Sequence, residues 1–578
     1  MQHRPYTLPL MITLLLLPMA CSGPQEAWQP TATDTRAARS YGGMVSSASE
    51  EATDAGLEVL RAGGNAVDAA VAVGFALAVT LPQAGNLGGG GFMVIRTADG
   101  RATTIDFRET APAAARRDMY LDSAGTFLPD RSQLGALAAG VPGSPAGLLM
   151  ALERFGRTDR ARVMAPAIRL AEQGFAMHPR LAADLESKLP LFARFPSSLR
   201  VFAPDSVVPS AGSIFRQPDL ALTLRRIADS GAAGFYRGPT ADLIAAQMER
   251  SGGIITRDDL AGYKAVERTP VIGTYRGDTV ISMPPPSSGG PLLIQMLNML
   301  ELYDFDSIPY HSAAHAHILA EIMRRAYADR AEFLGDPGFY KVPLAGLVSK
   351  EYARARAADI VPNATPSMTV GHGDPASFAR ESQQTTHYSV VDRDGNCVSV
   401  TVTLNGSFGS KLVVDGAGFL LNNEMDDFSA KPGAPNLYGL VGGEANAIVP
   451  GKRMLSSMTP TILLRGGRPW LVVGTPGGST IITTVLQTIH AQVDYGMSLS
   501  DAIESPRMHH QWLPDSIFYE PGTFGTGALD SLARMGYTTV DRRETSGHVD
   551  AIRIEEEKGR RLLLGWSDHR GYGAARGE

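Results

Sequence analysis

The chain has 578 residues, of which 44% are hydrophobic and 19% charged, and its net charge is −6. This is an ordinary globular composition, long enough for one large core or several domains. A slightly acidic chain without long basic runs argues against a nucleic-acid-binding function. Its two cysteines, Cys21 and Cys397, cannot form a disulfide framework.

The first 21 residues are predicted to be a secretory signal peptide. An apolar run from Leu8 to Leu17 is too short for a permanent membrane anchor, and the small residue Ala20 stands before Cys21. This junction also resembles a bacterial lipoprotein cleavage site, which would place a lipid on Cys21, although Pro18 departs from that pattern. The alternative is simple cleavage and a free exported protein. Residues 22–40, rich in Pro, Thr and Ala, are predicted to form a flexible leader.

Two helices are predicted next, from Ala52 to Ala62 and, capped by Asn65, from Ala66 to Thr80. The second helix is apolar all round and is therefore expected to be buried. The glycine-rich residues 85–91 lack the Lys-Ser/Thr ending of a phosphate loop and run into a predicted strand, Phe92 to Arg96. These glycines are therefore predicted to allow close backbone packing.

Arg108 follows a second predicted strand, which ends at Asp106. Its guanidinium would suit a carboxylate, because the fork donates two parallel hydrogen bonds, and a structural salt bridge is the alternative. Residues 113–280 are predicted to be mostly helical, and residues 355–381 to form an exposed linker.

Three histidines are the best metal-ligand candidates in the sequence: His311, His315 and His317. No His-Glu-x-x-His pattern accompanies them, and His317 would point away from the helix face shared by the other two. A solvated helix start is the favoured interpretation, and no metal site is predicted.

A β-hairpin is predicted from His387 to Leu404, with its turn at Asp394-Gly395. On the return strand, side chains alternate between an apolar face and a polar face that carries Ser399, Thr401, Thr403 and Asn405. A three-residue loop would place Thr385 opposite Thr403, whereas a two-residue loop would place Thr386 there. In either case two threonine hydroxyls and Asn405 meet at one end of the hairpin.

Two further stretches carry chemistry. The acids Glu424 and Asp427 could form a general acid/base pair or a metal site. Gly477 and Gly478 stand before a predicted helix from Ile481 to Val493, where two backbone N–H groups can point at one atom, as an oxyanion hole requires.

The stretch from Gln384 to Val390, with Thr403-Leu404-Asn405 behind it, resembles the processing site of the gamma-glutamyltranspeptidase family of N-terminal nucleophile hydrolases. The resemblance extends from about Tyr41 to Arg570. It implies an α+β fold, a four-layer αββα sandwich of two stacked, mainly antiparallel sheets flanked by helices. It also implies self-cleavage between Gln384 and Thr385. The products would be a large subunit, residues 41–384, and a small subunit, residues 385–578, forming one interleaved catalytic domain.

The resemblance also assigns catalytic roles. Thr385 would be the nucleophile and its own α-amine, with an unperturbed pKa near ~8, part of its base machinery. Thr403 would hold and polarise Thr385, while Gly477 and Gly478 would stabilise the oxyanion.

The substrate-binding residues implied by the resemblance are Arg108, Asn405, Glu424, Asp427, Ser456 and Ser457. The arginine and the two serines would bind the α-carboxylate of a γ-glutamyl group. The two acids would bind its α-ammonium, which has three donors and needs acceptors, and the asparagine would order the site. Some family members carry Gln at the position of Glu424. Tyr438, in the loop from Lys431 to Val449, would be the gate of a lid.

The implied activity is hydrolysis of the γ-glutamyl bond of glutathione and related compounds, and transfer of the γ-glutamyl group to amino acids or peptides. No cofactor is expected. The enzyme would be periplasmic, contacting a membrane only through a lipid on Cys21. A related self-cleaving β-lactam side-chain acylase, acting on glutaryl cephalosporins, and a non-catalytic exported binding lipoprotein are the alternatives.

Overall fold

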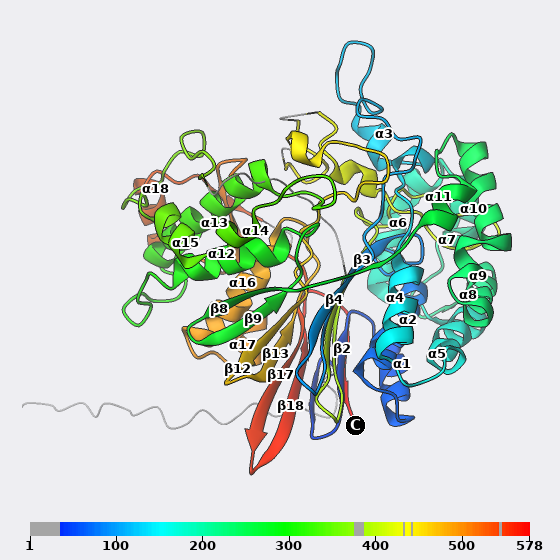
Figure 1. Cartoon of the computed structure of the whole chain (residues 1–578), viewed down its shortest axis with the longest axis horizontal. Coiled ribbons are helices and arrows are strands. Elements are labelled where there is room, and N and C mark those ends of the chain that lie inside the picture. Colours follow the sequence, from blue (N-terminus) through cyan, green and yellow to red (C-terminus); the bar gives the residue numbers. More distant parts are fainter. Residues whose placement is uncertain (1–34, 375–385, 432–433, 441–442, 543–545) are drawn as a thin grey trace, which may run out of the picture. The chain divides into compact units, whose positions relative to one another are not determined.

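The structure is a computed structural model, and it describes residues 35–374, 386–431, 434–440, 443–542 and 546–578. Within this part of the chain, two antiparallel sheets of seven strands each are stacked, and helices cover the outer side of each sheet (Figure 1). This is the α+β, four-layer αββα arrangement that the sequence predicts.

The first sheet has the strand order β1-β18-β17-β13-β12-β9-β8. Its strands are β1 (Ala37–Ser40), β18 (Arg560–Ser567), β17 (Asp550–Glu557), β13 (Arg468–Val473), β12 (Thr461–Arg465), β9 (Asp278–Ser282) and β8 (Val271–Tyr275).

The second sheet has the strand order β19-β2-β10-β11-β3-β4-β7. Its strands are β19 (Ala574–Gly577), β2 (Met44–Ser47), β10 (Thr386–Val391), β11 (Cys397–Thr403), β3 (Gly90–Arg96), β4 (Ala102–Asp106) and β7 (Val266–Arg268).

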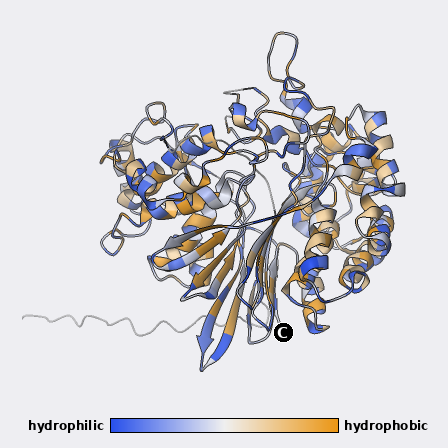
Figure 2. Ribbon diagram, in the orientation of Figure 1, coloured by the Kyte–Doolittle hydropathy of each residue, from blue (hydrophilic) through white to orange (hydrophobic). Residues whose placement is uncertain are grey.

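Each helical layer forms a core with one sheet, so that apolar residues gather on the facing surfaces (Figure 2). The helices on the side of the second sheet are α1 (Glu50–Arg61), α2 (Ala66–Thr80), α4 (Ser144–Phe155), α5 (Arg160–Gln173), α6 (Pro179–Phe192), α7 (Pro196–Phe202), α8 (Pro218–Ser230), α9 (Ala233–Tyr236), α10 (Gly238–Ser251) and α11 (Arg257–Gly262). Those on the side of the first sheet are α12 (Gly289–Leu300), α13 (Ala313–Phe333), α14 (Leu344–Leu347), α15 (Lys350–Ala357), α16 (Thr480–Val493), α17 (Leu499–Glu504) and α18 (Thr526–Arg534).

Shorter elements connect these layers. They are α3 (Pro129–Gln133), the two-stranded pair β5 (Phe175–Ala176) and β6 (Ile214–Phe215), the small sheet of β14 (Met508–His509), β15 (Ile517–Tyr519) and β16 (Thr539–Asp541), and the 3₁₀ turns η1 (Ala136–Ala138), η2 (Pro204–Ser206), η3 (Glu424–Asp427) and η4 (Glu444–Asn446).

Helix α2 shows why the pattern-based predictions were accurate for buried elements. Asn65 caps it through a reciprocal capping box with Asp68, and all of its residues are buried, as the apolar sequence predicts. Between the sheets lie an apolar cluster that includes Met44 and Ile552, a smaller apolar cluster around Phe92, and a polar part. On the polar part, Ser399 donates to the carbonyl oxygen of Val473 (3.2 Å) and accepts from the amide of Thr461 (3.0 Å). The predicted polar face of β11 therefore points toward the other sheet.

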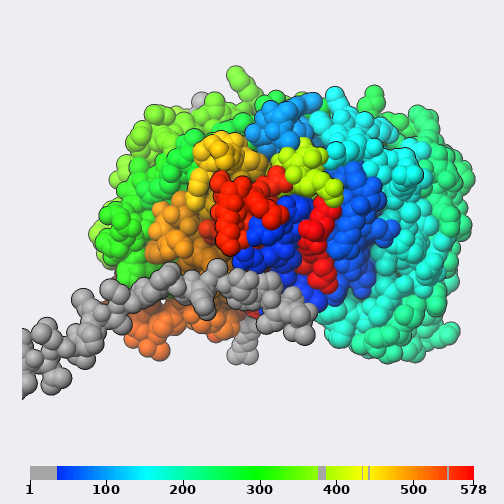
Figure 3. Space-filling view, turned by 90° about the horizontal axis from the view of Figure 1, so that it is seen from below, coloured from blue at the N-terminus to red at the C-terminus, as the bar shows by residue number. Residues whose placement is uncertain are grey.

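The two ends of the described chain lie side by side (Figure 3). Strand β1 pairs with β18, and β2 pairs with β19, so N-terminal and C-terminal strands are neighbours in both sheets. Ordered structure thus begins before Tyr41, and the last four residues of the predicted leader form β1. The signal peptide and Cys21 lie outside the described residues.

His315 and His317 lie in α13 and are buried, so the expectation of a solvated helix start was wrong for them, while His311 precedes the helix and is half-buried. His315 is buried and stacks on His490, with ring centroids 5.3 Å apart, and His317 hydrogen-bonds with Tyr537 (2.7 Å). The helix is covered by neighbouring elements on nearly all sides, which a local pattern of charged residues conceals. None of the helices in the described part of the chain is long and apolar enough to span a membrane.

Candidate active site

The β10–β11 hairpin brings threonine hydroxyls to one end of the second sheet. Asp392 donates to the carbonyl oxygen of Asn396 (3.1 Å), and Gly395 has a φ of 98°, so the loop has three residues. Thr386 pairs with Val402, and Thr403 is the next residue along β11. Gln384 and Thr385 lie outside the described residues, so the nucleophile and the cleavage point stay predictions.

Asn405 turns the chain sharply after β11. It has a φ of 69°, its amide donates to the hydroxyl oxygen of Thr403 (2.8 Å), and its side-chain amide donates to the carbonyl oxygen of Asn423 (3.0 Å). Within the described residues, no hydrogen-bond donor reaches the buried Oδ1 of Asn405. An unsatisfied buried acceptor costs roughly 1–3 kcal/mol, so this oxygen is suited to a donor on a bound molecule.

The glycine-rich stretch supports Thr403 from behind. Asn86 donates to the carbonyl oxygen of Thr403 (2.7 Å) and accepts from the amide of Gly89 (2.9 Å). A Cβ atom on Gly89 would collide with that same carbonyl oxygen, and one on Gly91 with the carbonyl oxygen of Thr401. The predicted close backbone packing is confirmed, and it holds Thr403 in place.

Arg108 is the centre of a buried charge cluster. Its Nη1 lies 2.5 Å from a carboxylate oxygen of Glu424 and 3.6 Å from one of Glu109, while its Nη2 pairs with Asp427. It also donates to the main-chain carbonyl oxygens of residues 454 (3.2 Å) and 455 (3.0 Å). The Arg108 side chain is only 1% exposed. Turn η3 and the loop before the serine pair therefore converge on one cation.

The cluster contains more acids than bases. Burial raises the pKa of Glu424 to about 8, against the opposing effect of Arg108, and likewise raises the pKa of Glu109 to about 8. Asp427 and Thr403 lower the pKa of Glu424. Buried carboxyls that resist ionisation beside a single guanidinium would gain from a second cation. The site is therefore suited to an ammonium group.

The sequence analysis assigned Arg108 to the α-carboxylate of a γ-glutamyl substrate and the two acids to its α-ammonium. It did not predict that these residues pair with one another. The two arrangements are compatible, because the two charged groups of an α-amino acid share one carbon atom and require adjacent partners of opposite sign. Glu109, with both carboxylate oxygens buried and without a hydrogen-bond donor among the described residues, was missed. Its position next to Arg108 in the sequence was the available signal.

Ser456 and Ser457 follow directly after the carbonyl groups that bind Arg108, and both are buried. The amide of Ser456 donates to the carbonyl oxygen of Pro286 (2.9 Å), and its hydroxyl oxygen accepts from the amide of Met458 (3.1 Å). The predicted carboxylate-binding serines thus lie beside the predicted carboxylate-binding arginine.

Gly477 and Gly478 adopt the left-handed region, with φ of 131° and 69°. A Cβ atom on Gly477 would lie 2.6 Å from the hydroxyl oxygen of Thr480 and 3.2 Å from the backbone of Gly547, so only glycine fits. Among the described residues, neither glycine amide has a hydrogen-bond acceptor. Two unsatisfied amides before helix α16 are what an oxyanion hole needs.

Tyr438 lies between the charge cluster and this glycine loop. Burial, followed by Asp427 and other acids, holds the pKa of its phenol well above the ordinary value. Its carbonyl oxygen accepts from Gln511 (3.2 Å), whose side-chain oxygen accepts from Ser479 (2.5 Å). The predicted lid residue is therefore connected to the residue that follows the glycine pair.

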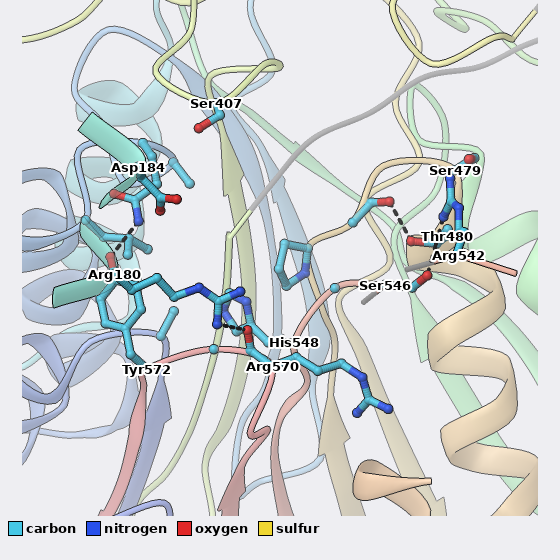
Figure 4. Close-up of a pocket in the computed structure, with 18 of the residues that line it drawn as sticks. Arg180, Asp184, Ser407, Ser479, Thr480, Arg542, Ser546, His548, Arg570 and Tyr572 are labelled. Carbon is cyan, nitrogen blue, oxygen red and sulfur yellow. Dashed lines mark hydrogen bonds between the residues drawn. The ribbon is translucent and has the colours of Figure 1, made fainter. Parts of the chain in front are cut away.

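A cavity of about 860 Å³ adjoins these residues and is lined by Tyr438, Gly477, Ser407 and others. Figure 4 shows Ser479 and Thr480 on one wall and Arg180, Asp184 and Tyr572 on the opposite one. Arg108 and its acids do not line the cavity, because they lie deeper in the protein. Tyr438, which lines the cavity, separates it from the charge cluster.

A family model described as Gamma-glutamyltranspeptidase matches residues 52–578. The chain belongs to the gamma-glutamyltranspeptidase family. The glutathione hydrolase proenzyme of Escherichia coli is 50% identical over 518 residues, covering 89% of this chain and 89% of that protein. The glutathione hydrolase proenzyme of Pseudomonas aeruginosa is 47% identical over 537 residues, covering 92% and 94% respectively.

A solved structure also shares this fold. The crystal structure of cephalosporin acylase from Bacillus halodurans superposes with a TM-score of 0.83 at 27% identity, covering 96% of this chain and 99% of that one. The fold predicted from the resemblance is confirmed. The shared architecture does not by itself separate a γ-glutamyltranspeptidase from an acylase.

Proposed function

We propose that this member of the family is a self-cleaving γ-glutamyltranspeptidase. It hydrolyses the γ-glutamyl bond of glutathione and related compounds and transfers the γ-glutamyl group to amino acids or peptides. The observation that carries the proposal is the buried cluster of Arg108 with Glu109, Glu424 and Asp427. It offers a guanidinium to a carboxylate and several acceptors to an ammonium, side by side.

Maturation begins with attack of the Thr385 hydroxyl on the carbonyl carbon of Gln384. The peptide C–N bond breaks, the released α-amine of Thr385 takes up the proton, and an ester joins the two residues. Water then hydrolyses the ester, leaving a carboxylate on Gln384 and a free N-terminal threonine. The family relatives named as proenzymes support this step.

In turnover, the Thr385 hydroxyl attacks the γ-carbonyl carbon of the substrate while its α-amine accepts the proton. The amides of Gly477 and Gly478 donate to the resulting oxyanion, and Thr403 orients the nucleophile. The C–N bond breaks, the leaving amine takes the proton, and a γ-glutamyl ester remains on Thr385. Water or an acceptor amine resolves this ester, which predicts ping-pong kinetics.

Binding of the glutamyl end uses the opposite charges of the cluster. The α-carboxylate meets Arg108, Ser456 and Ser457, and the α-ammonium meets Glu424 and Asp427 while Asn405 supplies a further acceptor. Tyr438 closes over the bound group, and the leaving group extends into the cavity. No cofactor takes part in these steps.

The experiment that tests the proposal combines maturation with turnover. Purified protein should contain two chains, with Thr385 as the first residue of the smaller one, and should hydrolyse glutathione. Thr385→Ala should remain full length and inactive, because the same hydroxyl is used twice. A different N-terminal residue on the smaller chain would disprove the assigned nucleophile. Stable full-length protein that binds ligand without turnover would favour the binding-lipoprotein alternative.

A second comparison separates the transpeptidase from the acylase. A γ-glutamyl anilide and a glutaryl anilide differ only in the α-amino group. The acid-rich cluster should favour the γ-glutamyl compound, whereas preferred turnover of the glutaryl compound or of glutaryl cephalosporins would favour an acylase.

The exported location is also part of the proposal, since the first 21 residues have the pattern of a signal peptide. The mature enzyme is periplasmic and carries a lipid on Cys21. Cys21→Ala should then move the activity from the membrane fraction to the soluble periplasmic fraction. An unmutated protein found only in the soluble fraction would remove the lipid from the proposal but not the export.

A further inference from the structure

We infer that helix α13 positions the two halves of the active site through two residues one turn apart, Arg330 for the carboxylate-binding serines and Tyr327 for the oxyanion loop. The inference rests on the proposed function, because it explains how that site is held. Each acts through a neighbouring residue of the proposed site, Arg330 through the serines and Tyr327 through Ser479, so both are positioning residues.

Arg330 is buried in the core beside the serine pair. Its Nε donates to the hydroxyl oxygen of Ser288 (3.0 Å), and its Nη2 donates to the hydroxyl oxygen of Ser457. Ser288 in turn donates to the carbonyl oxygen of Ser456 through its hydroxyl (2.8 Å) and through its amide (2.7 Å). One guanidinium thereby reaches both serines, Ser457 directly and Ser456 through Ser288.

This contact determines the direction of the Ser457 hydroxyl. A serine hydroxyl has one hydrogen, and a hydroxyl oxygen that accepts from a guanidinium cannot direct its hydrogen toward the same group. The hydrogen of Ser457 is therefore directed away from Arg330, as donation to a substrate carboxylate requires. The positive charge behind the oxygen also strengthens that donation.

Tyr327 lies on the same face of α13, three residues earlier. Its phenol donates to the carbonyl oxygen of Ser479, the residue that follows Gly478. Burial raises the pKa of this phenol well above its ordinary value, so it remains a donor. The guanidinium of Arg330 lies 5.3 Å from the Tyr327 ring, and the two side chains support each other.

The two contacts predict different kinetic defects. The carboxylate-binding half matters only to substrates with an α-carboxylate, whereas the oxyanion loop serves every acyl group. Three anilides distinguish them: the γ-glutamyl compound, the glutaryl compound, which lacks only the α-amine, and the γ-aminobutyryl compound, which lacks only the α-carboxylate. Selectivity is the ratio of kcat/KM for γ-glutamyl to that for γ-aminobutyryl.

Arg330→Gln, measured on the processed enzyme, should lower this selectivity by about tenfold, mainly through KM. Ser457→Ala should do the same, and the double variant should lose no more than Ser457→Ala alone, because Arg330 acts through that serine. Arg330→Lys keeps a charge and one donor, and should show a smaller loss with the same non-additivity. This variant carries the test if Arg330→Gln does not mature.

Tyr327→Phe is the matched control on the same helix face. It should lower kcat for all three anilides by a similar factor, about three- to tenfold, and leave selectivity unchanged. Additive losses in the double variant, or unchanged selectivity in both Arg330 variants, would overturn the inference for Arg330. A selectivity loss in Tyr327→Phe equal to that of Arg330→Gln would show that α13 acts only as general support. Failure of the unmutated enzyme to cleave the γ-glutamyl anilide would instead refute the proposed function.

Discussion

Replacing Glu424 by Gln should remove a pH dependence from substrate selection. Burial raises the pKa of Glu424 to about 8, while Arg108 opposes the shift. With that pKa, the ionised fraction rises from roughly 3% at pH 6.5 to roughly 75% at pH 8.5. Only the ionised carboxylate pairs with an ammonium, so the preference for a γ-glutamyl over a glutaryl anilide should rise by up to about twentyfold across this range.

The direction of this pH dependence follows from which protonation state of Glu424 the bound ammonium stabilises. An ammonium beside Glu424 stabilises its ionised form and lowers its pKa, so binding releases a proton below pH 8 and strengthens as the pH rises. Gln has nearly the same shape as the protonated acid. The variant should therefore match the unmutated enzyme near pH 6.5 and fall behind it at pH 8.5.

The assay is kcat/KM for both anilides at pH values from 6.5 to 8.5 on processed enzyme. Taking the ratio for the two substrates cancels the titration of the Thr385 amine, which both share. Glu109→Gln is the control, because Glu109 has a similarly raised pKa but is not assigned to the ammonium. It should retain the pH dependence with its midpoint at lower pH, because Glu109 raises the pKa of Glu424. If Glu424→Gln keeps the same slope as the unmutated enzyme, Glu424 does not receive the ammonium.

Three further outcomes are expected. Arg108→Ala should mature normally yet lose about ten- to hundredfold in kcat/KM for the γ-glutamyl anilide, since a charged hydrogen bond contributes roughly 1.5–3 kcal/mol, while the γ-aminobutyryl anilide should lose less; unchanged discrimination between the two would refute the carboxylate assignment. Gly478→Ala, at a φ of 69°, should displace an oxyanion donor and lower kcat by roughly 10²-fold with little change in KM, which steady-state kinetics would check. Glu109→Gln should raise the thermal unfolding midpoint more at pH 8 than at pH 5, because a buried acid whose folded pKa of about 8 exceeds its unfolded value costs stability as the pH rises between the two; an equal change at both pH values would show that Glu109 is ionised in the folded protein.

The fold could be predicted because its signals are local or come from the family resemblance. Asn65 and the apolar run after it define α2 by capping and composition alone, and Asp394-Gly395 marks the turn of the hairpin, whereas its three-residue length comes from the structure. The pairing of Arg108 with Glu424 and Asp427 could not be derived from spacing, because more than 300 positions separate these residues in the sequence. Only the stacking of distant segments brings them together.

The histidines and arginines of α13 show that a charged or polar sequence does not always predict solvent exposure. Arg324, Arg325 and Arg330 are all buried, with partners that come from distant segments. A charged helix is usually a solvated one, and the sequence of α13 does not distinguish an arginine that faces water from one that contacts a buried serine of another segment. Such residues become visible only when the whole core is assembled.

The order of strands affects how the cleaved protein would unfold and refold. In the second sheet β2 lies between β10 and β19, and in the first sheet β18 and β12 adjoin β1 and β9. A break at residue 384 would leave these neighbours on separate polypeptides. The two chains could separate only if β2 lost its pairing with both neighbouring strands. The cleaved protein should therefore unfold in one cooperative step. After unfolding, the two chains could refold only by associating with each other, whereas the uncleaved precursor folds as one chain. After cleavage, the protein would therefore no longer be able to refold as a single chain.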